Sequence, residues 1–270
     1  MMRKLALAVL FLLAFGVLKA AAQCSLTVTS MSFGTYTGAV LDGTATGKVV
    51  CPGAWDIPLN AGTGAGATET IRKMTGPGGA ELNYQVFQDA ARTINWGNTT
   101  GTELTGSGNA TVTFYGQIPA GQYVVPGTYT DTLSTATTNF SVTATVVKDC
   151  GVSATNMTFG NYTGAVNNST STITVTCTNT TTYTVGLSAG LATGATVTTR
   201  KMQNGTDLLK YALYSNSAMT TNWGNTAATN WVSGTGSGTA QGLTVYGQVA
   251  AGQFVTPGSY SDTITASVTY

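Results

Sequence analysis

The chain has 270 residues, of which 42% are apolar and only 8% are charged, with four cysteines and no histidine. This apolar content, with aromatic residues spread along the chain, predicts packed domains rather than disorder. The lack of histidine excludes His-based catalytic triads and His metal ligands. We expect no metal site and no other cofactor.

A secretory signal peptide is predicted over residues 1–22. Two basic residues precede an apolar run of 14 residues, Leu5 to Leu18, and small residues up to Ala22 form a cleavage site. The run is shorter than the ~20 residues that cross a bilayer, so no membrane span is expected. Its removal takes away three of the 11 basic residues and leaves 8 against 10 acidic ones. That balance excludes a basic surface for nucleic acid.

The remaining chain consists of two copies of one pattern, predicted to form domains over residues 23–149 and 150–270. Matching segments recur at an offset that changes only in loops. They include Phe33-Gly-Thr-Tyr-Thr-Gly38 and Phe159-Gly-Asn-Tyr-Thr-Gly164, Arg72-Lys-Met74 and Arg200-Lys-Met202, Asn95-Trp-Gly-Asn98 and Asn222-Trp-Gly-Asn225, and Pro126-Gly-Thr-Tyr-Thr-Asp-Thr132 and Pro257-Gly-Ser-Tyr-Ser-Asp-Thr263. A repeat of this length is too long for a solenoid and indicates a duplicated domain.

Within each copy the apolar residues recur with a period of two. Ile173 to Cys177 and Leu243 to Tyr246 alternate apolar with small polar residues, and Gly, Asn and Pro-Gly clusters separate such segments. No window has helical periodicity over three turns. The pattern predicts an all-β fold of two tandem immunoglobulin-like antiparallel β-sandwiches.

Four cysteines in an exported chain predict disulfides rather than thiol chemistry. Four cysteines allow three pairings, and the repeat selects among them. Cys24 and Cys51 are 27 residues apart, and so are Cys150 and Cys177. One disulfide within each copy is therefore expected.

The segment between the two copies predicts a strand that inserts into a sheet. Phe140, Val142, Ala144 and Val146 alternate with polar residues, which gives the strand one apolar and one polar face. By turning back at residues 137–139, this strand can complete the first domain. An alternative alignment makes residues 134–139 a loop inside the last strand, and the first domain is then also incomplete.

The second copy has no matching segment after Tyr270. It is predicted to lack its final strand and to accept one from another chain, because an incomplete sandwich exposes an apolar groove and an unpaired edge. The acceptor end is predicted at Ile264, Ala266, Val268 and Tyr270.

The repeated motifs resemble the Spore Coat Protein U domain family, the pilin fold of archaic chaperone/usher pili. The motifs are the opening Cys, Phe-Gly-x-Tyr-x-Gly, the second Cys, Arg-Lys-Met, Asn-Trp-Gly-Asn, Tyr-Gly-Gln and Pro-Gly-x-Tyr-x-Asp-Thr, found in both copies. The resemblance implies subunits that polymerise into surface fibres. Each such subunit lacks a strand, which a periplasmic chaperone and then an adjacent pilin subunit supplies, with assembly at an outer-membrane usher.

This resemblance predicts a non-enzymatic fimbrial subunit, secreted through the periplasm to the cell surface. Only Gln23 would precede Cys24 after cleavage, so the mature chain is expected to accept a strand but not to donate one. That places it at the end of a fibre, as a tip adhesin that mediates attachment and biofilm formation. The alternatives are a secreted spore or cell coat structural protein and a glycan-binding lectin.

Segments that are more apolar in the first copy than in the second, with Leu41 in place of Asn167 and Val125 in place of Thr256, are candidates for contact with an apolar or host surface. Val40 and Leu41, and Val124 and Val125, lie in turn-rich segments and are predicted to form adhesive loops. The alternative is that they are local variation of the core. No enzyme activity is expected, because the one Asp that recurs in each copy lies in a turn, where carboxylates accept backbone hydrogen bonds.

Overall fold

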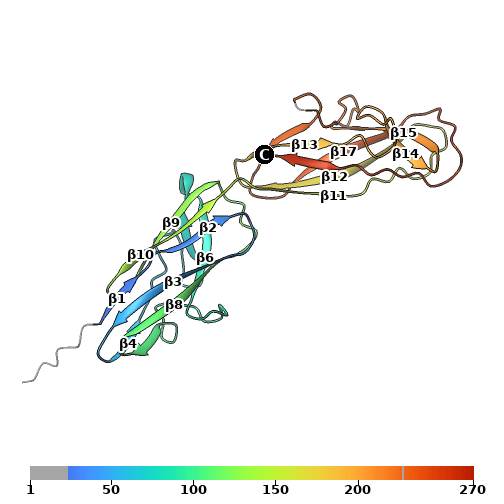
Figure 1. The fold of residues 1–270 in the computed structure, drawn as a ribbon. Helices are drawn as coiled ribbons and strands as arrows, with labels where there is room; N and C mark the ends of the chain where they lie inside the picture. Colours follow the sequence, from blue (N-terminus) through green and yellow to red (C-terminus); the bar gives the residue numbers. More distant parts are fainter. Residues whose placement is uncertain (1–23, 227) are drawn as a thin grey trace, which may run out of the picture.

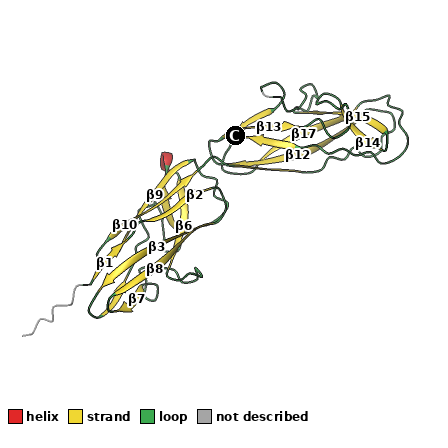
Figure 2. Cartoon of the chain, in the orientation of Figure 1, coloured by secondary structure: helices red, strands yellow, loops and turns green. Residues whose placement is uncertain are grey.

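The computed structural model describes residues 24–226 and 228–270, and the predicted signal peptide lies outside these ranges. The described residues form strands, turns and a single short 3-10 helix, η1 (Pro77–Gly79), as Figure 2 shows. The all-β prediction is confirmed. Within the described residues, no helix has the length and apolar character to cross a membrane.

Two elongated bodies follow one another along the chain, and residue 270 lies near the junction between them (Figure 1). Each has its own cluster of buried apolar residues, the first running from Leu26 to Val146 and the second from Ile173 to Val249. We refer to residues 24–149 as domain 1 and to residues 150–270 as domain 2.

Domain 1 is built on a curled eight-stranded sheet in the order β1-β3-β8-β6-β5-β9-β10-β2, with β4 and β7 paired separately. Its strands are β1 (Ser25–Val28), β2 (Met31–Tyr36), β3 (Leu41–Val50), β4 (Ala54–Ile57), β5 (Arg72–Thr75), β6 (Glu81–Phe87), β7 (Leu104–Ser107), β8 (Ala110–Ile118), β9 (Gly127–Ser134) and β10 (Asn139–Val146). The ladder between β10 and β2 is parallel, whereas the others are antiparallel. The expectation of purely antiparallel sheets is therefore wrong at this position.

Domain 2 has a five-stranded sheet in the order β11-β12-β17-β15-β14 and a three-stranded sheet in the order β16-β13-β18. Its strands are β11 (Cys150–Ala154), β12 (Asn167–Cys177), β13 (Thr182–Leu187), β14 (Arg200–Asn204), β15 (Asp207–Tyr214), β16 (Val232–Thr235), β17 (Gln241–Val249) and β18 (Ala266–Thr269). The immunoglobulin-like topology remains a prediction for both domains.

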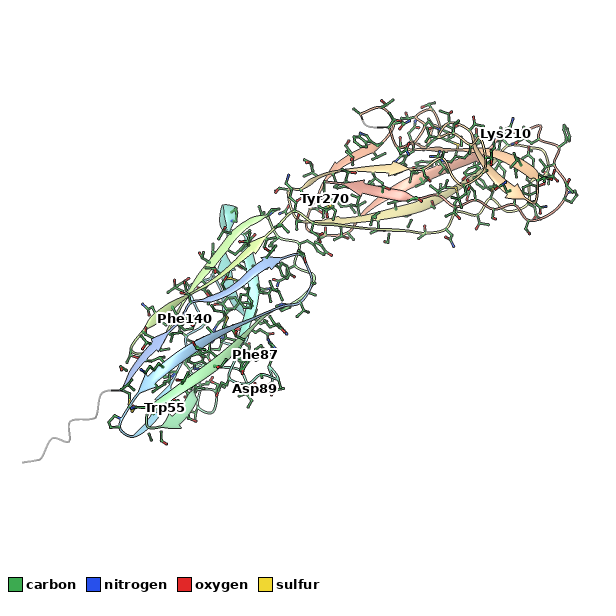
Figure 3. All side chains as sticks on the ribbon, in the orientation of Figure 1. Trp55, Phe87, Asp89, Phe140, Lys210 and Tyr270 are labelled. Carbon is green, nitrogen blue, oxygen red and sulfur yellow. A yellow bond between two sulfur atoms is a disulfide. The ribbon has the colours of Figure 1, made fainter. Side chains whose placement is uncertain are left out.

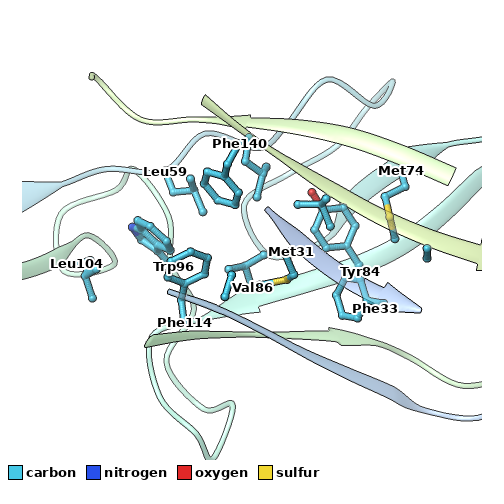
Figure 4. Packing of buried hydrophobic residues seen from close by; sticks show 14 of the residues in the cluster. Met31, Phe33, Leu59, Met74, Tyr84, Val86, Trp96, Leu104, Phe114 and Phe140 are labelled. Atoms are coloured by element: carbon cyan, nitrogen blue, oxygen red, sulfur yellow. The ribbon is translucent and has the colours of Figure 1, made fainter. Parts of the chain in front are cut away.

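Alternating burial explains why these segments form strands around a core. Figure 4 shows Phe140 of β10 beside Trp96 and Phe114. The centroid of the Phe140 ring lies 6.4 Å from that of Trp96 and 5.5 Å from that of Phe114. Trp96 is fully buried, and its indole N–H donates to the Ile57 carbonyl oxygen at 2.8 Å. Aromatic side chains of this size supply a large share of the burial energy of a core.

A buried arginine anchors the loops of each domain. Arg72 donates to the carbonyl oxygens of Asn60, Glu69 and Trp96, and burial lowers its pKa to about 10. Arg200 makes the equivalent contacts in domain 2 and has its pKa lowered to about 10 by the same cause. Hydrogen bonds to backbone oxygens are what make a buried guanidinium tolerable.

The disulfides join the first strand of each domain to the next strand of the same sheet. Cys24 is bonded to Cys51, after β3, and Cys150 is bonded to Cys177, at the end of β12. Both pairs span 27 residues. No cysteine among the described residues is free.

Candidate functional site: an open strand groove in domain 2

Strand β10 lies between β9 and β2 of domain 1. It pairs antiparallel with β9, with Val142 opposite Asp131, and parallel with β2, with Val142 opposite Met31. The chain enters β10 through a tight turn in which the Thr135 N–H donates to the Thr138 carbonyl oxygen. Because residues 135–138 form this turn, the alternative alignment with a loop inside the last strand is not what the structure shows.

The apolar face of β10 fills the core of domain 1. The side chains on this face, Phe140, Val142, Ala144 and Val146, are all buried. The residues between them face outward and are half-buried or exposed. The segment predicted to be an inserting strand thus occupies the groove of its own preceding domain.

Domain 2 has the same two flanking segments, but no strand from the described part of the chain lies between them. Residues 155–166 correspond to β2 and its neighbours, residues 258–265 correspond to β9, and neither segment forms a regular strand. Two cavities of about 470 and 800 Å³ lie along these segments. Both cavities are lined by Met157, Phe159, Met202 and Tyr260, so they form one continuous groove.

The groove has an apolar floor made by the second core cluster. Its deeper part is lined by Ile173, Leu187, Leu213 and Val245, all of which are buried. Beside them the Tyr211 hydroxyl donates to the Asp262 carboxylate at 2.8 Å, and burial together with this carboxylate raises the pKa of Tyr211. Domain 1 has the same pair, Tyr84 and Asp131, beneath β10.

Comparison with known proteins identifies the family. The Spore Coat Protein U domain matches residues 10–135 and again residues 136–267. The chain belongs to this family. It is also 37% identical over 155 residues to Protein U of Myxococcus xanthus. The aligned region covers 51% of this chain and 86% of that protein.

The fold of the two-domain chain has a counterpart among solved structures. The chaperone–tip adhesion subunit pre-assembly complex of the archaic chaperone-usher Csu pili of Acinetobacter baumannii contains a chain that aligns with a TM-score of 0.53 and 18% identity, over 91% of this chain and 100% of that one. A family 123 glycoside hydrolase from Clostridium perfringens aligns with a TM-score of only 0.31 and 9% identity, over 46% of this chain and 27% of that one, too little to indicate an activity.

In this family member, the predicted acceptor end only partly borders the groove. Ile264 and Ala266 line it. Val268 instead lies on β18, which pairs with β13 in the other sheet. The Tyr270 hydroxyl lies 3.4 Å from the Asp149 carboxylate, at the junction with domain 1. Two of the four predicted residues thus line the groove and two do not, and their role as the acceptor end remains a prediction.

The four residues of the predicted adhesive tip, Val40, Leu41, Val124 and Val125, differ in exposure, and their adhesive role remains a prediction. Leu41 and Val124 pack against the core of domain 1, and only Val40 is largely exposed. The neighbouring Tyr123 carbonyl oxygen accepts a hydrogen bond from the Asn179 N–H of domain 2. These loops therefore face the junction, while Trp55 marks the opposite, free end of domain 1 (Figure 3).

The described residues that could have formed a sugar, enzyme or metal site lie in other settings. Trp96 and Trp223 are buried core residues, so neither offers a stacking platform. Asp131 and Asp262 belong to different domains, and each accepts hydrogen bonds from its own loops. Among the residues the structure describes, no group of three or more His, Cys, Asp or Glu side chains could hold a metal ion.

Sequence reasoning missed Phe254, whose side chain is 97% exposed. Its counterpart in domain 1 is Tyr123, whose carbonyl oxygen accepts a hydrogen bond from the Asn179 N–H of domain 2. The aligned segments Ala120-Gly-Gln-Tyr123 and Ala251-Gly-Gln-Phe254 carried the signal, because they place an aromatic residue at the same position of both copies.

Proposed function

We propose that the chain is the two-domain adhesin at the tip of a chaperone-usher pilus, with domain 2 as a strand acceptor assembled by donor-strand complementation. The observation that carries this proposal is the contrast between the filled groove of domain 1 and the open groove of domain 2. The same fold buries an apolar strand in one domain and leaves the matching apolar surface exposed in the other.

An exposed apolar groove next to unpaired backbone requires a partner. The groove is a template for aggregation unless a strand covers it, and strand addition supplies main-chain hydrogen bonds while alternate side chains enter pockets. A periplasmic chaperone supplies the strand first. At an outer-membrane usher, an adjacent pilin subunit then replaces the chaperone strand, and the fibre is displayed at the cell surface.

Domain 1 takes the role of the adhesive head. Its groove is already occupied by β10, so it needs no partner to be folded. Its free end, marked by Trp55, is directed away from domain 2 and is the surface that would meet an apolar or host surface and start biofilm formation. The similar fold of the tip adhesion subunit of the Csu pilus supports the role of a tip adhesin for the whole chain.

The test fills the groove in the full chain. Residues 139–146 are appended through a flexible Gly/Ser linker of about ten residues. The matched control carries the same extension with the four apolar residues Phe140, Val142, Ala144 and Val146 replaced by Ser. The filled chain is expected to be monomeric and to melt at a higher temperature than the control, and beads coated with it are expected to attach to polystyrene and to cell surfaces.

The outcomes separate the proposal from its main alternative. If the apolar extension gives no more stability than the Ser control, domain 2 is not a strand acceptor. If the filled chain is stable but its beads do not attach to any surface, domain 1 is not an adhesin. The better hypothesis for the function of the chain is then a coat structural protein, which the name of the family favours.

A further inference from the structure

The junction between domains 1 and 2 contains the same elements as a junction between two subunits. Strand β10 lies in the groove of domain 1, three residues follow, and Cys150 then opens domain 2. By packing, β10 belongs to domain 1. The family match instead assigns residues 136–267 to the second copy, so in the family pattern β10 is an arm that precedes the opening cysteine.

This arm has a fixed register relative to the opening cysteine. Its buried residues Phe140, Val142, Ala144 and Val146 lie 10, 8, 6 and 4 positions before Cys150. The side-chain period of a strand is two, so a shift by one residue would turn the apolar face outward. The short connection through Asp149 fixes the spacing, because the Asp149 N–H and carbonyl oxygen both bond to Thr178 of domain 2.

The second domain also rests on a particular loop of the first. The Asn179 N–H donates to the Tyr123 carbonyl oxygen at 2.9 Å, and Gly238 lies against the same carbonyl. Gln122 holds this loop in place through hydrogen bonds to the backbone N–H and carbonyl of Asn83. A polar contact and a glycine that leaves room for it thus define the docking of domain 2.

Domain 2 repeats this loop at its end away from domain 1, where no described residue of domain 1 covers it. Gln253 bonds to the backbone N–H and carbonyl of Lys210, which lies at the end of domain 2 away from domain 1 (Figure 3). The next residue, Phe254, is almost fully exposed. A phenylalanine held on a braced loop and fully exposed to solvent marks a contact surface.

We propose that the groove of domain 2 and the loop at Phe254 form one docking surface for a further domain of the same family. That domain carries apolar residues 10, 8, 6 and 4 positions before its opening cysteine. Its arm runs parallel to residues 157–162 and antiparallel to residues 258–265, and its body covers Phe254. This inference rests on the proposed function and adds to it the partner's sequence pattern and its second point of contact.

The register is tested by disulfide trapping in the full chain. In domain 1, Thr143 lies opposite Thr130 and Thr145 opposite Thr128. The counterparts of Thr130 and Thr128 in domain 2 are Ser261 and Ser259. A synthetic peptide of residues 138–149 with Thr143→Cys is expected to crosslink to Ser261→Cys, and the peptide with Thr145→Cys to Ser259→Cys, each at least tenfold more than the exchanged combinations.

The melting temperature of the same mixtures distinguishes failure of the proposed register from failure of the strand-acceptor function. A peptide that stabilises the chain but crosslinks equally to both positions overturns the register and leaves the strand-acceptor function standing. A peptide that neither stabilises nor crosslinks overturns both. The peptide with Ser at its four apolar positions is the matched control and is expected to do neither.

Contact with Phe254 is tested by cleavage with chymotrypsin after this residue. The partner is represented by a longer probe, residues 138–270, which carries Phe254→Ser so that only the full chain can be cut at this position. The probe is expected to protect Phe254 of the full chain from chymotrypsin, whereas the 138–149 peptide fills the groove without protecting it. Phe254→Ser in the full chain is expected to weaken binding of the probe about tenfold. Because Phe254 also borders the outer cavity of the groove, the variant is expected to weaken binding of the peptide by a much smaller factor.

Equal cleavage at Phe254 with the peptide and with the bound probe overturns the docking contact. If the separate probe does not fold, residues 138–270 with Phe254 unaltered are fused through a linker after residue 270 of the full chain. Phe254 of domain 2 is then expected to be protected while an unaltered Phe254 in the added copy is cut, and equal cutting of both overturns the contact.

Discussion

The two domains contain matching residues in unequal environments. In domain 1, the residues around β10 are fully or almost fully buried, whereas their counterparts in domain 2 are only half-buried. The pairs are Met31 and Met157, Phe33 and Phe159, Tyr36 and Tyr162, Met74 and Met202, Tyr129 and Tyr260, and Leu133 and Ile264. The side-chain chemistry has changed little between the copies, so the exposure in domain 2 comes from the missing neighbour. The groove residues are core residues that need a strand.

The backbone shows the same difference. In domain 1, residues 31–36 and 127–134 are strands because β10 lies between them and supplies hydrogen bonds to both. In domain 2, the equivalent segments have no such partner and are irregular. Strand conformation at these positions is thus a consequence of pairing, since isolated extended segments are not stable in water.

The largest effect is expected from removing the ring that anchors β10. Phe140→Ala deletes a buried side chain that packs against both Trp96 and Phe114, and such changes cost about 3–5 kcal/mol. Calorimetry is expected to show a lower melting temperature for domain 1 and no change for domain 2. Equal destabilisation of both domains would mean that β10 does not act on domain 1 alone.

Each domain has one disulfide, and removing it tests whether the two disulfides stabilise their domains equally. Both close loops with a sequence separation of 27, so replacing either pair by serines is expected to cost about 3–4 kcal/mol on the chain-entropy account. Thermal unfolding of the Cys24/Cys51 and Cys150/Cys177 double variants measures this. A much smaller loss in domain 2 would show that its unfilled state is already loosened around the disulfide.

A matched pair of methionine variants measures the missing strand. Met31→Ala removes a fully buried side chain and is expected to cost about 2–5 kcal/mol. Met157→Ala removes a half-buried one at the equivalent position and is expected to cost about 1 kcal/mol. With the apolar donor extension in place, the cost of Met157→Ala is expected to rise toward that of Met31→Ala. A cost that does not change would mean that the added strand does not cover Met157.

Much of this arrangement could be predicted from sequence, because local patterns encode it. The alternation of Phe140 to Val146 predicted a buried strand, and the duplicated motifs predicted two similar β domains. The position of the first-copy hydrophobes could not be predicted, since Leu41 and Val124 look like exposed loop residues until their distant core neighbours are known. The path of β18 away from the groove is likewise set by long-range pairing with β13, which alternation alone does not specify.

A second difference between the domains concerns the edge of the small sheet. In domain 2, β18 pairs with β13, with Thr184 opposite Thr269 and Gly186 opposite Ser267. Domain 1 has no such strand beside β4, and a cavity of about 220 Å³ lies there instead. The residues at the positions of Thr184 and Gly186 are Asp56 and Pro58. A charge and a residue without an N–H are common devices that keep an edge strand from pairing.

The smallest effect on folding, with a visible effect on association, is expected from removing this protection. Asp56→Thr with Pro58→Gly introduces the domain 2 residues at these two positions of the edge. The loss of proline costs up to about 1 kcal/mol through the unfolded chain. In the background whose domain 2 groove is filled by the donor extension, the double variant is expected to dimerise through β4 at high concentration, whereas Asp56→Thr alone, which keeps the proline, stays monomeric. Analytical ultracentrifugation measures this. If the double variant stays monomeric, Asp56 and Pro58 are not what keeps the edge at β4 from pairing.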